Sequence, residues 1–254
     1  MTSGPHRFPA NGCWLEFFDP LIAELAGQAG YDYTMIDMEH GPGTLESLLR
    51  VVQASQLGGA KALVRIPEKD PRWIGRIMDL GADGAMVPMV NDAADAQSMA
   101  RGCLYPPGGT RGVATPVIRA SRYGADVGGY LRSYRDNFLL MVQIETAGAA
   151  RNAEQIAAVE GIDAVFIGPF DLSASLGFPG QPDHPQVREC IHGVAADVLR
   201  EGKTLAGLPT PGVSVETLFT QGFDFVLGGM DVMLLREAMY ADVERHRAAC
   251  KAKA

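Results

Sequence analysis

The segment Gly161-Ile162-Asp163-Ala164-Val165-Phe166-Ile167-Gly168 shows a pattern that recurs along the chain: a glycine, a spacer residue and an aspartate introduce a short apolar run. Such a glycine suits the left-handed C-terminal cap of a helix, after which the chain turns into a strand. The same pattern introduces other apolar runs at Gly30-Tyr31-Asp32, Gly81-Ala82-Asp83 and Gly222-Phe223-Asp224. The repeat therefore predicts helices that alternate with buried strands.

Between these four runs lie four more, so that eight strands are expected. The expected strands are residues 12–16, 33–38, 62–66, 84–89, 139–145, 164–168, 204–208 and 225–229. Stretches with helical periodicity fall between them, at 20–29, 45–57, 71–80, 93–103, 147–159, 185–201 and 215–221, and a final helix begins near Val232. This alternation over 254 residues is typical of an α/β protein with a (β/α)8 TIM barrel.

Composition favours a single barrel domain over residues 1–254. Apolar residues make up 47% and charged residues 20% of the chain, and no Ser-, Gln- or Pro-rich stretch marks a linker. Segment 105–137 is longer than a typical connection, and its Pro-Pro-Gly-Gly and several arginines suggest a lid or an interface. In a barrel of this kind the active site is built at the carboxyl ends of the strands.

The bulk charge and the cysteines exclude several classes of protein. A formal net charge of −8 argues against nucleic acid or an anionic membrane as partner, since both favour a basic face. No apolar run approaches the roughly 20 residues that span a bilayer, and Met1 to Phe8 lacks the apolar core of a signal peptide, so a cytoplasmic location is expected. The four cysteines show no Cys-x-x-Cys spacing and are expected to be reduced.

Two acidic residues stand where apolar strands end. Glu145 closes the run from Leu139 to Ile144, with Gln143 just before it, and Asp171 follows the turn Gly168-Pro169-Phe170. Two carboxylates that converge in a partly desolvated site should have raised pKa values unless a cation neutralises them. Oxygen ligands suit Mg²⁺ or Mn²⁺, although Co²⁺ and Zn²⁺ are also compatible. The alternative is that both acids are ordinary helix caps.

Further polar residues follow the second and third expected strands. His40 is the only one of the five histidines at a strand end, and an imidazole there could act as a general base or as a structural hydrogen-bonding group. Asp37 and Glu39 precede it. Arg65 interrupts an apolar run, and a buried guanidinium needs an anionic partner, which could be Asp37, a bound anion or both.

The lysines give negative information. None of the five lies at the carboxyl end of an expected strand, where a Schiff-base lysine would have to reach a substrate. If carbonyl chemistry occurs here, a metal must polarise the carbonyl. The chain also lacks a Gly-x-Gly-x-x-Gly after its first strand and a Walker-type Gly-Lys-Ser/Thr, which argues against dinucleotide or ATP binding.

Several short motifs follow one another from about Trp14 to the last helix. They are Ile36-Asp37-Met38-Glu39-His40-Gly41-Pro42, Val64-Arg65, Val87-Pro88-Met89, Tyr105-Pro106-Pro107 with Gly109-Thr110-Arg111-Gly112, Gln143-Ile144-Glu145-Thr146 and Gly168-Pro169-Phe170-Asp171-Leu172-Ser173. Taken together and in this order, the motifs resemble those of the HpcH/HpaI aldolases, the class II metal-dependent pyruvate aldolases. Within that family the chain looks most similar to the 4-hydroxy-2-oxoheptanedioate and 2-keto-3-deoxy-sugar-acid aldolases. The resemblance implies a TIM barrel of the phosphoenolpyruvate/pyruvate type and reversible cleavage of a 4-hydroxy-2-oxo acid to pyruvate and an aldehyde.

The resemblance also implies roles for individual residues. Glu145 and Asp171 would bind the divalent metal, which chelates the keto and carboxylate oxygens of pyruvate, and Arg65 would stabilise the enolate. His40 would take the C4 hydroxyl proton, oriented by an acid that this family supplies from a neighbouring subunit. The matching residue is Asp79. Family members are typically homohexamers that exchange terminal helices, so an exchanged C-terminal helix is implied here.

The substrate is expected to contact Gln143, the turn Gly168-Pro169-Phe170 and Leu208. Backbone N–H groups at the start of the helical turn after Gly168 could hold a substrate carboxylate. Departures from the family lie on the aldehyde side, at Phe170, at Leu208-Pro209-Thr210-Pro211 and at the bulky Glu16-Phe17-Phe18. The aldehyde itself therefore stays open.

Two other functions remain open at this stage. A citrate-lyase-like or malyl-CoA-type lyase would use the same enolate but need a coenzyme A site, and a non-catalytic barrel would bind a keto acid without turnover. Decarboxylation of oxaloacetate is an expected side activity, because the same groups would stabilise the enolate left by loss of CO₂. Arg111 and Arg119 could be substrate contacts, loop braces or interface residues.

Overall fold

A computed structural model describes residues 6 and 8–253, so most of the Met1–Phe8 segment considered above, with Ala254, lies outside the described residues. Eight parallel strands form a closed barrel in the order β1-β2-β3-β4-β5-β6-β7-β8. The strands are β1 (Ala10–Leu15), β2 (Tyr33–Asp37), β3 (Lys61–Arg65), β4 (Gly84–Val87), β5 (Leu139–Ile144), β6 (Ala164–Ile167), β7 (Thr204–Gly207) and β8 (Phe225–Met230). The predicted (β/α)8 barrel is confirmed.

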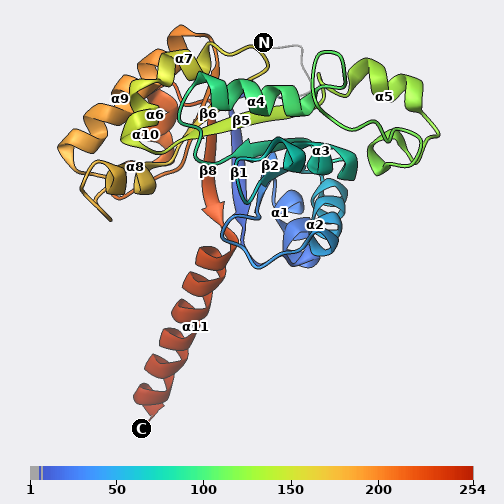
Figure 1. The fold of residues 1–254 in the computed structure, drawn as a ribbon. Coiled ribbons are helices and arrows are strands. Elements are labelled where there is room, and N and C mark those ends of the chain that lie inside the picture. The colour runs from blue at the N-terminus through green and yellow to red at the C-terminus, as the bar shows by residue number, and fades with distance from the viewer. Residues whose placement is uncertain (1–5, 7, 254) are drawn as a thin grey trace.

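Helices surround the barrel, and Figure 1 shows the long C-terminal helix projecting away from it beyond the end of β8. The helices that follow the strands are α1 (Pro20–Gln28), α2 (Leu45–Gly58), α3 (Pro71–Leu80), α4 (Ala93–Cys103), α6 (Ala147–Arg151), α7 (Ala153–Ala157), α8 (Pro169–Ser175), α9 (Pro185–Arg200), α10 (Val215–Thr220) and α11 (Asp231–Lys253). A 3-10 turn η1 (Arg119–Ser121) and α5 (Val127–Ser133) lie between β4 and β5. No helix among the described residues is both long and apolar enough to cross a membrane.

Three of the four repeat glycines lie at the end of a helix as the sequence predicted, and Gly161 is the exception. Gly81, for example, ends α3 with φ of 76°, a left-handed conformation that costs a glycine little, and its N–H donates back to Met78 O. Gly30, Gly161 and Gly222 also have positive φ. Gly30, Gly81 and Gly222 follow the ends of α1, α3 and α10, whereas α7 already ends at Ala157 and Gly161 lies in the turn between that helix and β6.

Alternate residues of each strand point to opposite sides of the barrel wall. In β5, Leu139 and Met141 belong to the cluster that fills the barrel interior, whereas Leu140, Val142 and Ile144 belong to the layer between strands and helices. The same alternation holds in β2, where Tyr33 and Met35 point inward and Ile36 points outward. It follows that the residues in inward register at the carboxyl ends line the mouth of the barrel.

Two expectations about the connections need revision. The single helix expected over 147–159 is two short helices, α6 and α7, because the chain breaks at Asn152, whose side chain instead donates to Asn91 O at 2.9 Å. Segment 105–137 is anchored beside α3 rather than over the mouth: Arg119 donates to Leu80 O at 2.8 Å and to Gln56 Oε1 at 2.8 Å. These contacts give no support to a lid and make Arg119 a brace.

Candidate active site

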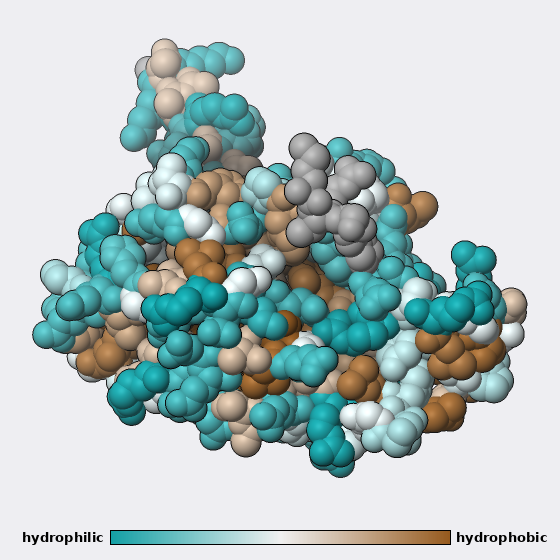
Figure 2. Space-filling model, turned by 90° about the horizontal axis from the view of Figure 1, so that it is seen from above, coloured by the Kyte–Doolittle hydropathy of each residue, from teal (hydrophilic) through white to brown (hydrophobic). Residues whose placement is uncertain are grey.

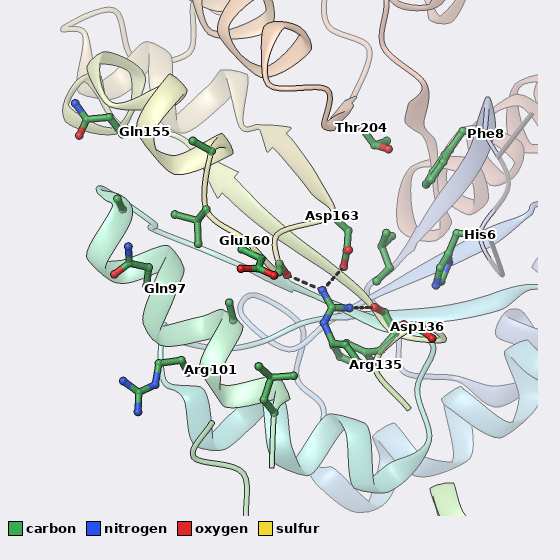
Figure 3. A pocket seen from close by; sticks show the side chains of 18 residues that line it. His6, Phe8, Gln97, Arg101, Arg135, Asp136, Gln155, Glu160, Asp163 and Thr204 are labelled. Carbon is green, nitrogen blue, oxygen red and sulfur yellow. Dashed lines mark hydrogen bonds and ion pairs between the residues drawn. The ribbon is translucent and has the colours of Figure 1, made fainter. Parts of the chain in front are cut away.

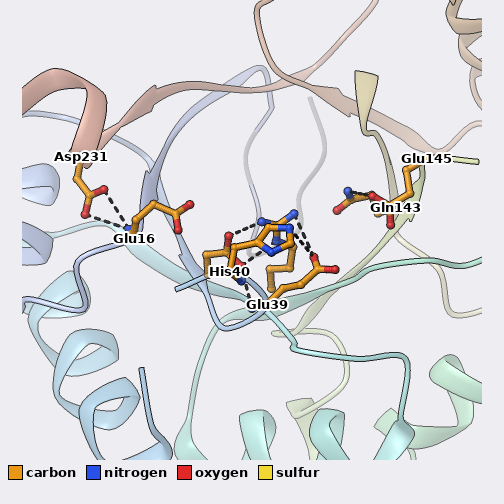
Figure 4. A network of polar contacts seen from close by, with 8 residues as sticks. Glu16, Glu39, His40, Gln143, Glu145 and Asp231 are labelled. Atoms are coloured by element: carbon orange, nitrogen blue, oxygen red, sulfur yellow. Dashed lines mark hydrogen bonds and ion pairs between the residues drawn. The ribbon is translucent and has the colours of Figure 1, made fainter. Parts of the chain in front are cut away.

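The polar side chains predicted at the strand ends gather around one opening, at the carboxyl ends of the strands (Figure 4). Strand alternation brings them there. Gln143 and Glu145 continue the inward register of Met141 in β5, and Asp37 and Arg65 continue the inward registers of β2 and β3. The inward residues below them are apolar, so the polar groups form a cap on a packed core.

Glu145 is almost fully buried, with 3% of its surface exposed. Its carboxylate accepts a hydrogen bond from the backbone N–H of Met89 at 2.6 Å and one from Gln143 Nε2. Met89 has φ of 56°, a strained value for a residue with a side chain, and this turn presents its N–H to the carboxylate. Burial raises the pKa of Glu145 to about 7, the hydrogen bond from Met89 opposes this, and the nearby charge of Asp171 adds to it.

Asp171 lies in the first turn of α8 and is exposed to solvent. Its charge contributes to the raised pKa of Glu145 and also to that of Glu39, where burial is the first cause. The three carboxylates therefore face a common space. Among the described residues, no group of three or more His, Cys, Asp or Glu could hold a metal by itself. An ion here would be held by Glu145 and Asp171, with ligand and water oxygens completing its coordination.

Arg65 is buried, and its guanidinium group is paired with the carboxylates of Asp37 and Glu39. Nε donates to Asp37 Oδ1 at 2.9 Å, Nη2 pairs with Asp37 Oδ2, and Nη1 lies 3.2 Å from Glu39 Oε2. The guanidinium also lies over the ring of Trp14, 4.6 Å from its centroid. Burial alone would raise the pKa of Asp37, but the hydrogen bonds and charge of Arg65 hold it below its usual value. Asp37 is thus confirmed as a partner of Arg65.

His40 lies at the rim, with 64% of its side chain exposed. Its backbone N–H donates to Asp37 Oδ1 at 3.3 Å, and its Nε2 is 3.9 Å from Glu39 Oε2. Gly41, next in the chain, packs so closely against Phe18 and Asp37 O that a Cβ atom would clash. The loop is therefore fixed by its glycine and by Asp37, while the imidazole is free to meet a ligand.

The residues expected to contact substrate divide into two groups. Gln143 is buried, and its Oε1 has no hydrogen-bond partner among the described residues. Gly168 faces the same spot, since a Cβ atom on it would lie 2.9 Å from Gln143 Nε2 and 3.0 Å from Glu145 Cβ. Pro169 and Leu208 instead line a small hollow beside α9, and Phe170 is 47% exposed. Gln143 and Gly168 are thus the predicted substrate contacts that lie against Glu145.

Asp79 does not meet His40 within one chain. Helix α3 runs from the carboxyl end of β3 back toward the amino end of β4, which leaves Asp79 at the far end of the barrel from the mouth. There it pairs with Arg111 Nη2 at 2.6 Å, and Arg111 is itself buried against the rings of Tyr105 and Tyr130. Arg111 is therefore a brace for Asp79 and segment 105–137. The role of Asp79 toward a neighbouring subunit stays a prediction.

Two residues of the mouth had no predicted role. Asp231, the first residue of α11, accepts the backbone N–H groups of Glu16 at 3.0 Å and Phe17 at 3.1 Å, and so ties the end of β8 to the end of β1. Trp14 forms the floor under Arg65. In the sequence, Trp14 could have been identified from its position two residues before Glu16 in a strand whose side chains alternate. Asp231 could have been identified as an acidic residue directly after the last strand.

A large hollow lies at the other end of the barrel, around residues that precede or begin strands, such as Phe8, Leu139 and Thr204 (Figure 3). Its volume is about 1080 Å³. Its central cation is already satisfied, because Arg135 donates to Asp163 at 2.9 Å and to two backbone carbonyls. Figure 2, which views the molecule from this side, shows a mostly hydrophilic surface with scattered hydrophobic areas. The carboxylate pair and Arg65 make the mouth the better candidate.

Comparison with known proteins agrees with this assignment. A family model described as HpcH/HpaI aldolase/citrate lyase matches residues 10–238. A hydroxypyruvate/pyruvate aldolase of Pseudomonas aeruginosa is 39% identical over 228 residues, covering 90% of this chain and 85% of that protein. A 2-keto-3-deoxy-L-rhamnonate aldolase of Shigella sonnei is 37% identical with the same coverage. The crystal structure of an HpcH/HpaI aldolase/citrate lyase family protein from Burkholderia cenocepacia superposes with a TM-score of 0.88 at 30% identity, covering 94% of this chain and 95% of that one.

Proposed function

The chain belongs to the HpcH/HpaI aldolase/citrate lyase family, and from this membership we propose that it is a pyruvate aldolase, a carbon–carbon lyase that reversibly cleaves a 4-hydroxy-2-oxo acid to pyruvate and an aldehyde. The observation that carries the proposal is the facing of two groups across one mouth: the carboxylates Glu145 and Asp171, and the guanidinium of Arg65. The two carboxylates can bind a cation that holds an oxo acid, and the guanidinium can stabilise negative charge.

The family is generally dependent on a divalent metal, and Glu145 and Asp171 fit one. Glu145 is buried, its pKa is raised toward neutrality in part by Asp171, and the neighbouring Gln143 Oε1 is an unused acceptor among the described residues. A cation would remove the repulsion between the carboxylates of Glu145 and Asp171. Oxygen donors favour Mg²⁺ or Mn²⁺, with Co²⁺ or Zn²⁺ also compatible. When bound, the cation would supply the positive charge that stabilises a pyruvate enolate. Helix α8, with Gly168 and Pro169 at its start, would place backbone N–H groups near the substrate carboxylate.

Arg65 provides a second, permanent positive charge on the other side of the mouth. Asp37 fixes its Nε and Nη2, so the guanidinium does not have to reorganise during the reaction. Its Nη1, which lies 3.2 Å from Glu39 Oε2, is the nitrogen that could donate a hydrogen bond to a developing enolate oxygen. Asp37 and Glu39 therefore act through Arg65, as residues that position it.

In the cleavage direction, His40 would accept the proton of the C4 hydroxyl group. The C3–C4 bond then breaks, the C4 carbon leaves as the aldehyde carbonyl, and the bonding electrons form the enolate of pyruvate. Protonation of C3 gives the pyruvate methyl group. The exposed imidazole at the rim suits this role, because an aldehyde must enter and leave there. We propose that Asp79 of a neighbouring subunit orients the imidazole, within a homo-oligomer that is expected to be a hexamer.

The test is exchange of the pyruvate methyl protons with D₂O, followed by NMR on chelated protein with and without Mg²⁺ or catalytic Mn²⁺. It needs no knowledge of the aldehyde. Metal-dependent exchange that is lost in Glu145→Gln and kept in Glu46→Gln, an exposed control on α2, is the expected result. Exchange that survives exhaustive chelation, or trapping of a lysine by borohydride, would remove the proposal. Cleavage of an acyl-CoA but not of a free 4-hydroxy-2-oxo acid would favour the thioester lyase instead.

A further inference from the structure

Glu16 is the residue of the mouth that the proposed mechanism does not use. It follows β1 and continues the inward register of Trp14, which belongs to the interior cluster. In the closed barrel β1 lies across from β5, so Glu16 and Glu145 stand on opposite sides of the opening. Figure 4 shows the Glu16 side chain pointing into this opening, on the same side as His40.

The position of Glu16 is fixed by its surroundings. Its backbone N–H donates to both carboxylate oxygens of Asp231 at 3.0 Å, so the end of β1 has little freedom to move the side chain away. The side chain is half-buried and interacts with Asp37 and Arg65. The pKa of Glu16 is raised to about 7, first by burial and then by the charge of Asp37 and a hydrogen bond with it. The charge of Arg65 opposes this shift.

Among the described residues, no unshared cation is recorded beside Glu16. Arg65, the cation that the structure places beside it, is already shared by Asp37 and Glu39. If the oxo-acid end of a ligand lies at Glu145 and Asp171 and its C4 hydroxyl group at His40, its other end would extend across the opening toward β1 and β2, where Glu16 and His40 stand. The C4 substituent, which becomes the rest of the aldehyde, would then lie near Glu16.

We propose that Glu16 is a specificity-determining residue that rejects acceptor aldehydes carrying a carboxylate and admits uncharged ones, with hydroxylated aldehydes favoured. The inference rests on the proposed aldolase function. A carboxylate on the substituent would meet a like charge in a partly desolvated site, where repulsion is much stronger than in water. A hydroxyl group, by contrast, can donate to the Glu16 carboxylate or accept from its protonated form.

The experiment compares two acceptors of nearly the same shape, 4-oxobutanoate and its methyl ester, in aldol addition to pyruvate at pH 8. The wild-type protein is expected to use the ester at least about tenfold better, as kcat/KM. Glu16→Gln keeps the shape of the side chain but removes its charge, and should raise the relative kcat/KM for 4-oxobutanoate about tenfold or more. Glu46→Gln, which removes a charge far from the mouth, should leave the ratio unchanged.

Methyl proton exchange of pyruvate separates the possible failures. If exchange is intact in Glu16→Gln and the preference between the two acceptors does not change, the specificity role of Glu16 is wrong while the aldolase proposal stands. If Glu16→Gln lowers exchange and slows both acceptors equally, Glu16 merely supports Asp37 and Arg65, which also overturns the inference. Absence of metal-dependent exchange in the wild-type protein removes the underlying function instead.

Discussion

At the scale of one residue, Arg65 is a buried charge whose desolvation is unfavourable but whose position at the mouth is fixed. Its side chain has 10% of its surface exposed and that of Asp37 has none, so neither charge is well solvated. A buried ion pair contributes little net stability compared with an apolar pair, but removal of one partner leaves an uncompensated charge. The pair therefore fixes a cation at the mouth, and its integrity should be visible in the stability of the whole protein.

We expect Arg65→Met to lower the free energy of unfolding by about 3 to 5 kcal/mol at pH 7, because Asp37 then stays buried without a partner. Arg50→Met is the matched control: Arg50 pairs with Glu46 on the exposed face of α2, so its loss should cost less than about 0.5 kcal/mol. Urea unfolding at one protein concentration, with chelator, measures both.

The pH dependence has a definite sign. Because the pKa of Asp37 is lowered in the folded state, the ion pair stabilises the protein at pH values above the ordinary pKa of aspartate. This stabilisation is lost as the pH falls through the lowered pKa, so the cost of Arg65→Met should shrink below about pH 4. Equal costs for Arg65→Met and Arg50→Met at pH 7 would contradict the account.

Glu145 should couple metal binding to protons. Its pKa is raised to about 7, mainly by burial, so below that pH a proton competes with the cation for the carboxylate. We expect Mn²⁺ affinity to fall about tenfold for each pH unit below 7, with about one proton released per ion at pH 6 and few at pH 8. Calorimetry in buffers of different ionisation enthalpy measures the released protons.

Whereas Mn²⁺ affinity should fall as the pH is lowered, the free energy of unfolding of the metal-free protein should rise. A carboxyl whose folded pKa is raised destabilises the fold when ionised, so chelated protein should gain stability as the pH falls from 7 toward the ordinary pKa of glutamate. Glu145→Gln should abolish the proton release and reduce this gain, part of which remains because the pKa of Glu16 is also raised to about 7. Glu16→Gln should keep the proton release. Mn²⁺ binding at pH 6 with unchanged affinity and no proton release would exclude Glu145 as the coupled group.

At the scale of secondary-structure elements, the junction of β6 and α8 depends on the absence of one side chain. Gly168 lets the chain turn beside Gln143 and Glu145, and a Cβ atom there would lie 2.9 Å from Gln143 Nε2. Because Glu145 is held from the other side by the N–H of Met89, the pair cannot move away easily. The strand, the turn and the helix thus share one close contact at the candidate metal site.

Gly168→Ala is expected to lower Mn²⁺ affinity and methyl proton exchange at least tenfold, since it displaces Gln143 and Glu145. Gly193→Ala provides the control: Gly193 lies in α9 with nothing within 4 Å of an added Cβ atom. There alanine should stabilise the helix by about 0.5 to 1 kcal/mol without changing activity. Full activity in Gly168→Ala would show that the junction tolerates the side chain and that the contact is not functional.

At the scale of the whole molecule, we propose that α11 and Asp79 both act between subunits. Helix α11 leaves the barrel at Asp231 and projects away from it (Figure 1). It exposes apolar side chains, among them Leu234, Met239 and Tyr240. Such a surface on an extended helix favours contact with another copy, as the exchanged terminal helices of the family imply. Asp79, fixed by Arg111 at the far end of the barrel from its own His40, would serve a neighbour.

Mixing of two inactive variants tests this arrangement. His40→Ala and Asp79→Ala should each cleave poorly alone, whereas mixed oligomers formed by co-refolding should regain activity, because some sites then combine an intact His40 with an intact Asp79 from the other chain. Random assembly predicts recovery on the order of a quarter of wild-type activity. Activity of the Asp79→Ala variant alone at the wild-type level would remove Asp79 from the mechanism, and failure of the mixture to recover would place both residues outside a shared site.

Periodicity and glycine placement in the sequence determined the barrel, because each strand and helix is set by local alternation and by caps. Position at the carboxyl ends of the expected strands identified Asp37, Arg65, Gln143 and Glu145 as residues of the mouth. Only the tertiary structure decided which of these groups touch: the Arg65–Asp37 pair joins residues 28 positions apart, and Glu145 meets the N–H of Met89 from 56 positions away. Likewise, only the closure of the barrel brought Glu16 opposite Glu145, because distances between strand ends depend on how the sheet closes and not on any local pattern.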